Sequence, residues 1–368
     1  MDAALAALVD RVRAARTDKT ILDIHGGGTK VFYGEASRGE PLEVTGLTGI
    51  SSYEPSELVV TVRAGTPLAQ LEAALAECGQ CLPFEPPRFA DPIKGGECTG
   101  TVGGMVAAGL AGPARAAVGG VRDYVLGATL QNGRAELLNF GGTVMKNVAG
   151  YDVSRALAGS MGCLGVICEV SLKVLPQAPA TLTLRLEMDE EQAIRRLNEW
   201  GGRPLPLNAS AWWEDTLVLR LAGATAAVTA ARELLGGEAV EPGLAVGFWR
   251  GLRDHDDEFF AGAARAVQQG ATLWRLSVPA TTPPLRLSGE QLIEWGGAQR
   301  WLCTSMASSA VREAAAAAGG HATLFRAQDK RAGVFTPLQP PLDRIHRQLK
   351  SAFDPDGVFN PGRLYPGL

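Results

Sequence analysis

Two glycine-dense stretches decide how this chain is interpreted: HGGGTK at residues 25–30 and TGTVGG at residues 99–104. The first follows a predicted strand over residues 20–24, and such a turn can aim successive backbone N–H groups at a pyrophosphate. The second offers hydroxyls, free N–H groups and the start of a helix in one place, which also suits an anion. Two such loops in one half of the chain favour one large phosphate-bearing ligand.

Each stretch has an ordinary alternative when it is considered by itself. The first is open to being a plain tight turn, and the second to being a glycine- and alanine-rich helix packed in a core. The first stretch is not a Rossmann motif, because the three-glycine spacing of that motif is absent and residues 31–34 do not open a helix. We therefore expect a dinucleotide site of another type.

Composition excludes several classes of protein. The chain has 368 residues, more than one hydrophobic core usually serves, so we expect two domains. A formal net charge of -4 without long basic runs argues against nucleic acid as a partner. The stretch 102–112 is too short and too rich in glycine to span a membrane, and the acidic start at Asp2 is unlike a signal peptide. We expect a cytoplasmic protein.

Cysteines and histidines give no pattern typical of a metal site. Six cysteines in a chain without an export signal are expected to be reduced thiols. Cys78 and Cys81 have the spacing of a metal knuckle, but no second pair and no nearby histidine completes four ligands. His255 lies among acids at residues 253–258, and we expect a solvated helix start there in preference to a metal cluster. We therefore predict no bound metal.

The first part of the chain is predicted to end near residue 178, where Pro176 and Pro179 accompany a rise in charge. It is expected to begin with a helix over 2–16, followed by strands over 20–24 and 57–62. The next element is a helix that buries Leu68, Leu71 and Leu75. A hairpin of strands over 124–130 and 135–140 is expected to turn at Asn132-Gly133, and a strand over 166–174 ends this part.

The second part is predicted to be α+β with an antiparallel sheet of ferredoxin-like units. Its first unit has expected strands over 180–187, 208–213 and 216–222 with helices over 189–200 and 225–235, in the order of a split βαββαβ unit. The second unit is less clear, with strands over 272–278, 300–304 and 321–326 and a helix over 308–318. An amphipathic helix over 342–349 begins the tail.

Seven motifs occur in an order that resembles a known family. They are GGGT (26–29), VTVRAG (60–65), LP (82–83), TVGG (101–104), GVRDYVLG (120–127), VMKNVAGYD (144–152) and GSMGCLGVI (159–167). This order is similar to the FAD-binding domain of the vanillyl-alcohol oxidase type, also called the PCMH-type domain. The closing sequence AFDPDGVFNPGR (352–363) resembles the tail of the FAD-linked 2-hydroxyacid dehydrogenases within that family.

The resemblance implies a fold, a cofactor and a set of contacts. It implies a PCMH-type FAD-binding domain of two α+β subdomains over 1–178, a smaller α+β cap domain over 179–335, and a tail over 336–368 that packs back on the FAD domain. The isoalloxazine would lie toward the cap. The residues that would contact FAD are His25, Gly26, Gly27, Gly28, Thr29, Lys30, Phe84, Glu85, Pro86, Pro87, Gly100, Thr101, Val102, Gly103, Gly104, Arg122, Asp123, Tyr124, Val166 and Ile167.

Some of these assignments have alternatives. Arg122 and Asp123 could form a structural ion pair in place of a flavin contact. Lys146 and Asn147 are candidates for the flavin edge, where a cation would stabilise a reduced anionic flavin, but a surface lysine is the alternative. The FAD is expected to be noncovalent, because Gly28 and Thr29 occupy the stretch where some relatives carry an attachment histidine. Cys98 is one residue out of step with the second attachment cysteine of bicovalent relatives.

The catalytic constellation of those dehydrogenases is missing. The family's active members carry paired histidines one residue apart and a later Glu-His pair, which supply a base and metal ligands. The four histidines of this chain, His25, His255, His321 and His346, form neither pattern. The resemblance is strongest to the FAD-binding E subunits of glycolate oxidases, which work with a larger catalytic flavin subunit and an iron–sulfur subunit.

The predicted function is therefore that of an FAD-dependent oxidoreductase subunit, active on a small 2-hydroxy acid at the level of a complex. One alternative is a stand-alone 2-hydroxyacid dehydrogenase that uses Lys146, Asn147, Arg250 or Arg275. Another is a structural or regulatory paralogue. The tryptophans beyond residue 200 are expected in the core, with a subunit interface as the alternative.

Overall fold

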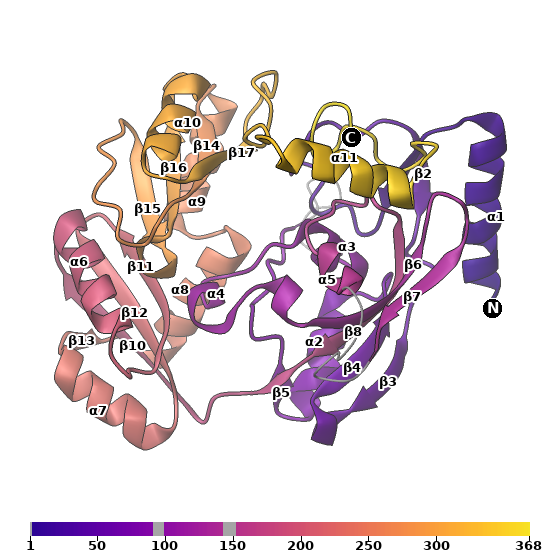
Figure 1. The fold of residues 1–368 in the computed structure, drawn as a ribbon. Coiled ribbons are helices and arrows are strands. Elements are labelled where there is room, and N and C mark those ends of the chain that lie inside the picture. Colours follow the sequence, from indigo (N-terminus) through magenta and orange to yellow (C-terminus); the bar gives the residue numbers. More distant parts are fainter. Residues whose placement is uncertain (1, 91–98, 143–151) are drawn as a thin grey trace.

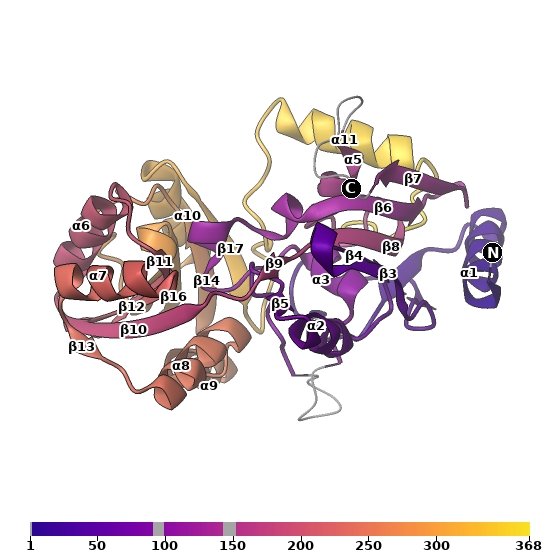
Figure 2. The same ribbon diagram turned by 90° about the horizontal axis from the view of Figure 1, so that it is seen from below.

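The structure is a computed structural model that describes residues 2–90, 99–142 and 152–368 (Figure 1). Its chain forms two halves, each built around an antiparallel sheet. Figure 2 shows the two sheets in separate halves of the molecule, with the C-terminal helix α11 (Leu342–Phe353) returning to the half that contains α1 (Ala3–Asp18). The expected α+β class is confirmed. No described helix has the length and apolar character needed to cross a membrane.

The first half contains a five-stranded sheet with β8 at its centre. The strands are, in sheet order, β3 (Ile50–Glu54), β4 (Val59–Arg63), β8 (Val166–Lys173), β6 (Val125–Gln131) and β7 (Leu137–Gly141). The hairpin between β6 and β7 turns at Asn132, as the Asn-Gly signal predicts, and the Asn132 carbonyl accepts the backbone N–H of Ala135 at 3.0 Å.

Two helices cover one face of this sheet. The predicted apolar face of α2 (Leu68–Glu77), formed by Leu68, Leu71 and Leu75, is fully buried. It packs in one cluster with residues of α3 (Val102–Ala108) and of β4 and β8. This packing fixes the N-terminus of α3, because Thr101 and Gly103 are held against the turn that precedes α2.

A smaller layer lies beside the sheet. The strands β1 (Leu22–His25) and β2 (Glu40–Glu43) pair in parallel, and the buried face of α1 packs on them. Phe359 from the tail is buried in the same cluster, and its backbone bridges to Leu22. The tail thus lies directly against the strand that leads into the HGGGTK loop.

The second half is an eight-stranded sheet made of two units. Its strands are, in sheet order, β13 (Glu238–Ala239), β10 (Ala180–Glu187), β12 (Thr216–Gly223), β11 (Leu207–Trp213), β15 (Glu290–Glu294), β16 (Gln299–Thr304), β14 (Thr272–Ser277) and β17 (His321–Arg326). All pairs are antiparallel. β11 and β15 join the two units.

The helices of the second half lie on both faces of its sheet. One face is covered by α6 (Glu190–Gly201), α7 (Thr225–Leu235) and α10 (Ser308–Ala317). The other face packs on α8 (Pro242–Asp254) and α9 (Glu258–Gln268), together with aromatic residues of the first half such as Tyr33 and Phe89. Adjacent side chains of β14 point to opposite faces of the sheet. Leu273 packs in the cluster that contains α8 and α9, and Trp274 packs in the cluster that contains α10.

Candidate functional site

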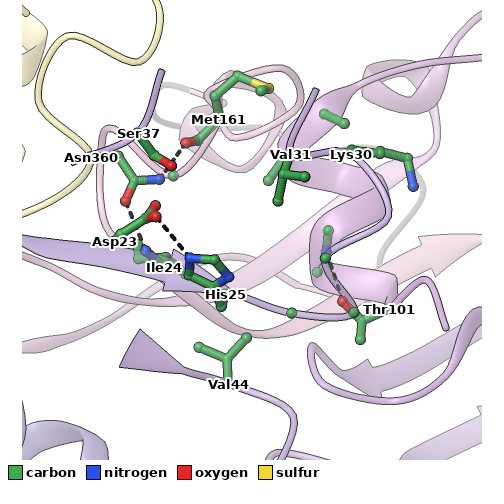
Figure 3. Close-up of a pocket in the computed structure, with 18 of the residues that line it drawn as sticks. Asp23, Ile24, His25, Lys30, Val31, Ser37, Val44, Thr101, Met161 and Asn360 are labelled. Carbon is green, nitrogen blue, oxygen red and sulfur yellow. Dashed lines mark hydrogen bonds and ion pairs between the residues drawn. The ribbon is translucent and has the colours of Figure 1, made fainter. Parts of the chain in front are cut away.

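A pocket of about 850 Å³, open to solvent, lies beside the HGGGTK loop (Figure 3). Its lining comes from the end of β1 with its loop, the start of α3, the loop before β8 and the tail. The predicted FAD contacts that line it are His25, Gly26, Gly27, Gly28, Thr29, Lys30, Thr101, Gly103, Gly104 and Ile167.

The two glycine-dense loops pack directly on each other. A Cβ added at Gly27 would lie 1.6 Å from the Thr99 carbonyl oxygen, and one added at Gly26 would lie 2.5 Å from Thr101 Oγ1. The Thr99 hydroxyl donates to the Gly27 carbonyl at 2.8 Å and ties the loops together. Gly28 differs, because its φ of +71° requires glycine while its absent side chain would meet open space. The loop backbone therefore faces the pocket without side chains in the way.

Thr101 shapes the second loop. Its Oγ1 accepts the backbone N–H of Gly104 at 3.2 Å and caps α3. Gly103 allows α3 to approach the end of β4, since a Cβ there would lie 2.7 Å from the Cβ of Ala64. The first turn of α3 is thereby held at the pocket wall.

His25 lies at the end of β1 with a fixed ring. Its Nε2 is 2.7 Å from the Asp23 carboxylate, and both side chains are largely buried (Figure 3). The side chains project from alternate positions of one short strand, so they share a face. The pair lies in the same wall of the pocket as Ile24 and Val44.

The tail supplies two pocket residues that the sequence analysis did not single out. Asn360 Oδ1 accepts the backbone N–H of Ile24 at 2.9 Å, and its Nδ2 donates to the Met161 carbonyl at 2.7 Å (Figure 3). Arg363 donates to the carbonyls of Val31 at 3.0 Å and Tyr33 at 2.6 Å. Both residues belong to NPGR at 360–363, within the closing sequence that resembles the family's tail. That motif is the sequence feature from which they could have been identified.

The other predicted FAD contacts lie elsewhere. Phe84 is fully buried and packs against Tyr124 with 5.3 Å between ring centroids. Tyr124 donates its hydroxyl to the Val118 carbonyl at 2.6 Å. Glu85 pairs with Arg220 of the second half at 2.7 Å. The residues outside the lining of this pocket are Phe84, Glu85, Pro86, Pro87, Gly100, Val102, Arg122, Asp123, Tyr124 and Val166.

Arg122 and Asp123 do not form the ion pair that was the alternative. Among the described residues no salt bridge joins them, and Asp123 instead accepts the Gly120 backbone N–H at 2.8 Å. Arg122 lines a different pocket, between the two halves. The candidates Lys146 and Asn147, and also Cys98, lie outside the described residues.

The expected helix start near His255 is confirmed, and Asp256 and Glu258 are exposed there, but the His255 ring is not solvated. Asp257 does cap α9, by accepting the backbone N–H of Phe260 at 2.9 Å. His255, however, stacks on Phe260 at 3.7 Å between ring centroids and packs against Phe89, Trp301 and Phe325. Burial, followed by the charges of Arg326 and Arg275, lowers the pKa of His255 well below its ordinary value.

Of the tryptophans beyond residue 200, four are buried, as expected: Trp212, Trp249, Trp274 and Trp301. Trp213 and Trp295 are half-buried. Over the ranges 2–90, 99–142 and 152–368, no three histidine, cysteine or acidic side chains are grouped so that they could hold a metal ion.

Comparison with known proteins agrees with this geometry. Residues 4–141 match the family described as FAD binding domain. The chain is 48% identical over 362 residues to the glycolate oxidase subunit GlcE of Escherichia coli (strain K12), covering 98% of this chain and 97% of that protein. It is 29% identical over 138 residues to the glycolate oxidase subunit GlcD of Bacillus subtilis (strain 168), covering 38% of this chain and 28% of that protein.

A solved structure shares the fold. An alkyldihydroxyacetonephosphate synthase matches with a TM-score of 0.67 at 14% identity, and the match covers 97% of this chain and 75% of that one. Because the GlcE similarity runs over nearly the whole of both proteins, the chain belongs to the family of the glycolate oxidase subunit GlcE, and its amino-terminal part is an FAD-binding domain.

Proposed function

We propose that this chain is the FAD-binding subunit of a multi-subunit enzyme that oxidises glycolate to glyoxylate. The observation that carries the proposal is the pocket formed by the two interlocked glycine-dense loops, in a chain 48% identical to a glycolate oxidase subunit over nearly its whole length. The FAD is proposed to be noncovalent.

The residues at the pocket fit a dinucleotide. Because residues 26–28 are glycines, backbone groups in place of side chains face the pocket at these three positions. The backbone of Gly26 to Lys30 and the residues Thr101 to Gly104 would hold the pyrophosphate. FAD would supply a group that accepts two electrons and releases them singly. The protein's part is to bind it, orient it and keep water from it.

Electrons are proposed to pass from this flavin to an iron–sulfur subunit, with a larger flavin subunit performing the substrate chemistry. The histidines support this division. His255 is enclosed by aromatic rings, and His25 is held by Asp23. Enclosure leaves His255 unable to serve as the base for the hydroxyl proton of a substrate, and His25 lies at the loop proposed to hold the pyrophosphate. The complex is proposed to be cytoplasmic and to reach the inner face of the membrane only through its partners.

The test is anaerobic reduction of the purified yellow chain. We expect glycolate and D-lactate to leave its flavin absorbance unchanged, and glycolate to bleach it after the GlcD-type subunit is added. Bleaching of the isolated chain at a catalytic rate would instead support a stand-alone 2-hydroxyacid dehydrogenase. A chain that neither contains FAD nor takes it up would support the structural or regulatory alternative. Acid precipitation should release all of the FAD, and retention in the pellet would contradict noncovalent binding.

A further inference from the structure

A groove of about 970 Å³, open to solvent, lies in the second half between the edge of β10 and helix α8. These two elements pack against each other beside the short strand β13 (Figure 2). The side of the groove formed by α8 and the turn before it is mostly apolar, with Val240, Pro242, Ala245, Val246 and Trp249. β10 supplies Thr181, Leu182 and Thr183, and the groove shares no described lining residue with the pocket proposed for FAD.

The edge of β10 lacks a partner strand beside this groove. β13 pairs with only two residues of β10, and the ladder ends where the Val240 N–H donates to the Thr183 carbonyl at 2.9 Å. In the same register Thr181 would lie opposite Pro242, which has no N–H and begins α8. Alternate residues of a strand direct their backbone groups to the same edge, so those of Thr181 face away from β12. No hydrogen bond outside the strand ladders involves them in the described ranges.

α8 places exposed apolar surface beside this open edge. Val246 lines the groove, and 69% of its surface is exposed. Trp249 is buried, and its Nε1–H donates to the Thr183 hydroxyl at 2.9 Å. The side chain of Leu182 packs in the cluster on the opposite face of the sheet, which contains α7, so its place in the lining comes from its backbone. An apolar groove beside unpaired backbone is the geometry that binds an added peptide strand.

The groove also has an excess of positive charge. Three arginines line it, Arg220, Arg250 and Arg253, against one acid, Glu85. Glu85 pairs with Arg220 at 2.7 Å, and Arg253 donates two hydrogen bonds to Asp254 at 2.8 and 2.6 Å. Arg250 is exposed, and no salt bridge involves it in the part of the chain that the structure describes. The groove is therefore complementary to an apolar segment that carries a carboxylate.

We propose that an extended segment of the GlcD-type flavin subunit binds here and adds to the edge of β10 as one more strand. Its backbone would exchange hydrogen bonds with the N–H and C=O of Thr181. Alternate side chains of such a strand point into the groove, where an apolar one meets Val246 and Trp249 and an acidic one meets Arg250. The proposal rests on the proposed function, which pairs this chain with a GlcD-type subunit.

The first experiment titrates the FAD-loaded full chain with the purified GlcD-type subunit and measures the Kd by calorimetry. Val246→Asp places a charge in the apolar part of the interface, and Arg250→Glu repels the carboxylate, so we expect each to raise the Kd by about tenfold to a hundredfold. Leu244→Asp is the matched control, because Leu244 is 70% exposed on the same helix but does not line the groove. Arg232→Glu, at an exposed position of α7, is the control for charge reversal. Both controls should leave the Kd unchanged.

A second measurement follows the backbone directly. Hydrogen exchange at the Thr181 amide should slow when the GlcD-type subunit binds, which contact between side chains alone would not cause. Thr181→Pro removes this N–H without removing a bond to β12, so we expect its Kd to rise by about threefold to tenfold. FAD content and circular dichroism that match wild type establish that each variant is folded.

The outcomes separate this inference from the proposed function. If the wild-type chain binds the GlcD-type subunit but Val246→Asp and Arg250→Glu bind it equally well, the inference is overturned and the proposed function stands. An effect of Leu244→Asp as large as that of Val246→Asp would overturn the assignment to the groove, and unchanged exchange at Thr181 would overturn strand addition. Failure of the GlcD-type subunit to bind the wild-type chain would contradict both. Binding that depends on the groove residues, without bleaching of the flavin by glycolate, would contradict the proposed function and support the inference.

Discussion

At the scale of single residues, the HGGGTK loop contains three glycines with two different reasons for being glycine. Gly26 and Gly27 leave room for the loop at 99–101, which would collide with any Cβ at these positions. Gly28 has a positive φ but open space in place of its side chain. The sequence pattern does not distinguish the three glycines, whereas the structure shows that the first two give room for a neighbouring loop and the third allows a positive φ.

This difference predicts unequal effects of two matched substitutions. In Gly27→Ala the new methyl group must separate the two loops, so we expect loss of FAD and destabilisation by several kcal/mol, on the scale of overpacking. In Gly28→Ala only backbone strain is added, about 1–2 kcal/mol, with FAD retained at lower affinity. Thermal unfolding of both FAD-free variants and fluorescence titration with FAD measure the two effects. Equal effects in the two variants would contradict this account of the loops.

At the scale of elements, the tail is held by one buried lysine at the end of α11. Lys350 Nζ donates to the carbonyls of Cys163 at 2.8 Å and Phe359 at 2.7 Å, and to the Asp354 carboxylate at 2.6 Å. Asp354 in turn accepts the backbone N–H groups of Val358 and Phe359. This network folds the chain so that Asn360 reaches the pocket.

We predict that Lys350→Met weakens both stability and FAD binding. It leaves Asp354 as a buried charge without its cation, which costs roughly 3–5 kcal/mol. Because the tail presents Asn360 and Arg363 to the pocket, FAD affinity should fall as well. Urea unfolding and FAD titration are the measurements, with Arg347→Met as the control, since Arg347 forms a more exposed ion pair with Asp343 on the same helix. A stable variant with unchanged FAD affinity would show that the tail does not support the pocket.

Elements with clear periodicity were predictable, and elements stabilised by tertiary contacts were not. The strands 180–187 and 321–326 and the helix 225–235 agree residue for residue with the structure. α8 was missed, because Gly243, Gly247 and Gly251 weaken its helical propensity, while the burial of Trp249 stabilises it. β15 is polar in sequence and becomes a strand because it pairs with β11 and β16.

At the scale of the whole molecule, two acids lie among packed residues of the second half, Glu294 on β15 and Asp257 at the start of α9. Burial raises the pKa of Glu294 to about 7, although hydrogen bonds from Trp301 and Gln299 oppose this rise. Burial also raises the pKa of Asp257 to about 6. Negative charges at Asp257 and Glu85 contribute to the raised pKa of Glu294. Protonation of Glu294 therefore bears on the stability of the second half, where its hydrogen-bond partners lie.

The sign of the pH dependence follows from these values. The folded state binds a proton at Glu294 more tightly than the unfolded chain, whose carboxyl has a pKa of 4.5. The associated stability is fully present below pH 4.5 and is lost as the pH rises through about 7. We predict that Glu294→Gln, which stays neutral, gains stability relative to wild type by up to about 3 kcal/mol between pH 5 and pH 8.

Urea unfolding at pH 5 and at pH 8 checks this prediction. The control Glu290→Gln changes a more exposed acid at the start of the same strand and should show no such difference between the two pH values. A stability difference between Glu294→Gln and wild type that does not grow with pH would contradict the assignment.

The sequence by itself determined the α+β plan and the two loops suited to a phosphate-bearing ligand, and the resemblance of its motifs to a family added the expectation of FAD. These features depend on local properties: hydrophobic periodicity, glycine placement and turn signals. The tertiary structure alone decided that Asn360 and Arg363 join the pocket and that Glu85 ties the halves together. These residues are far apart in the chain and come together only through sheet pairing and packing between the halves, which no short window of sequence contains.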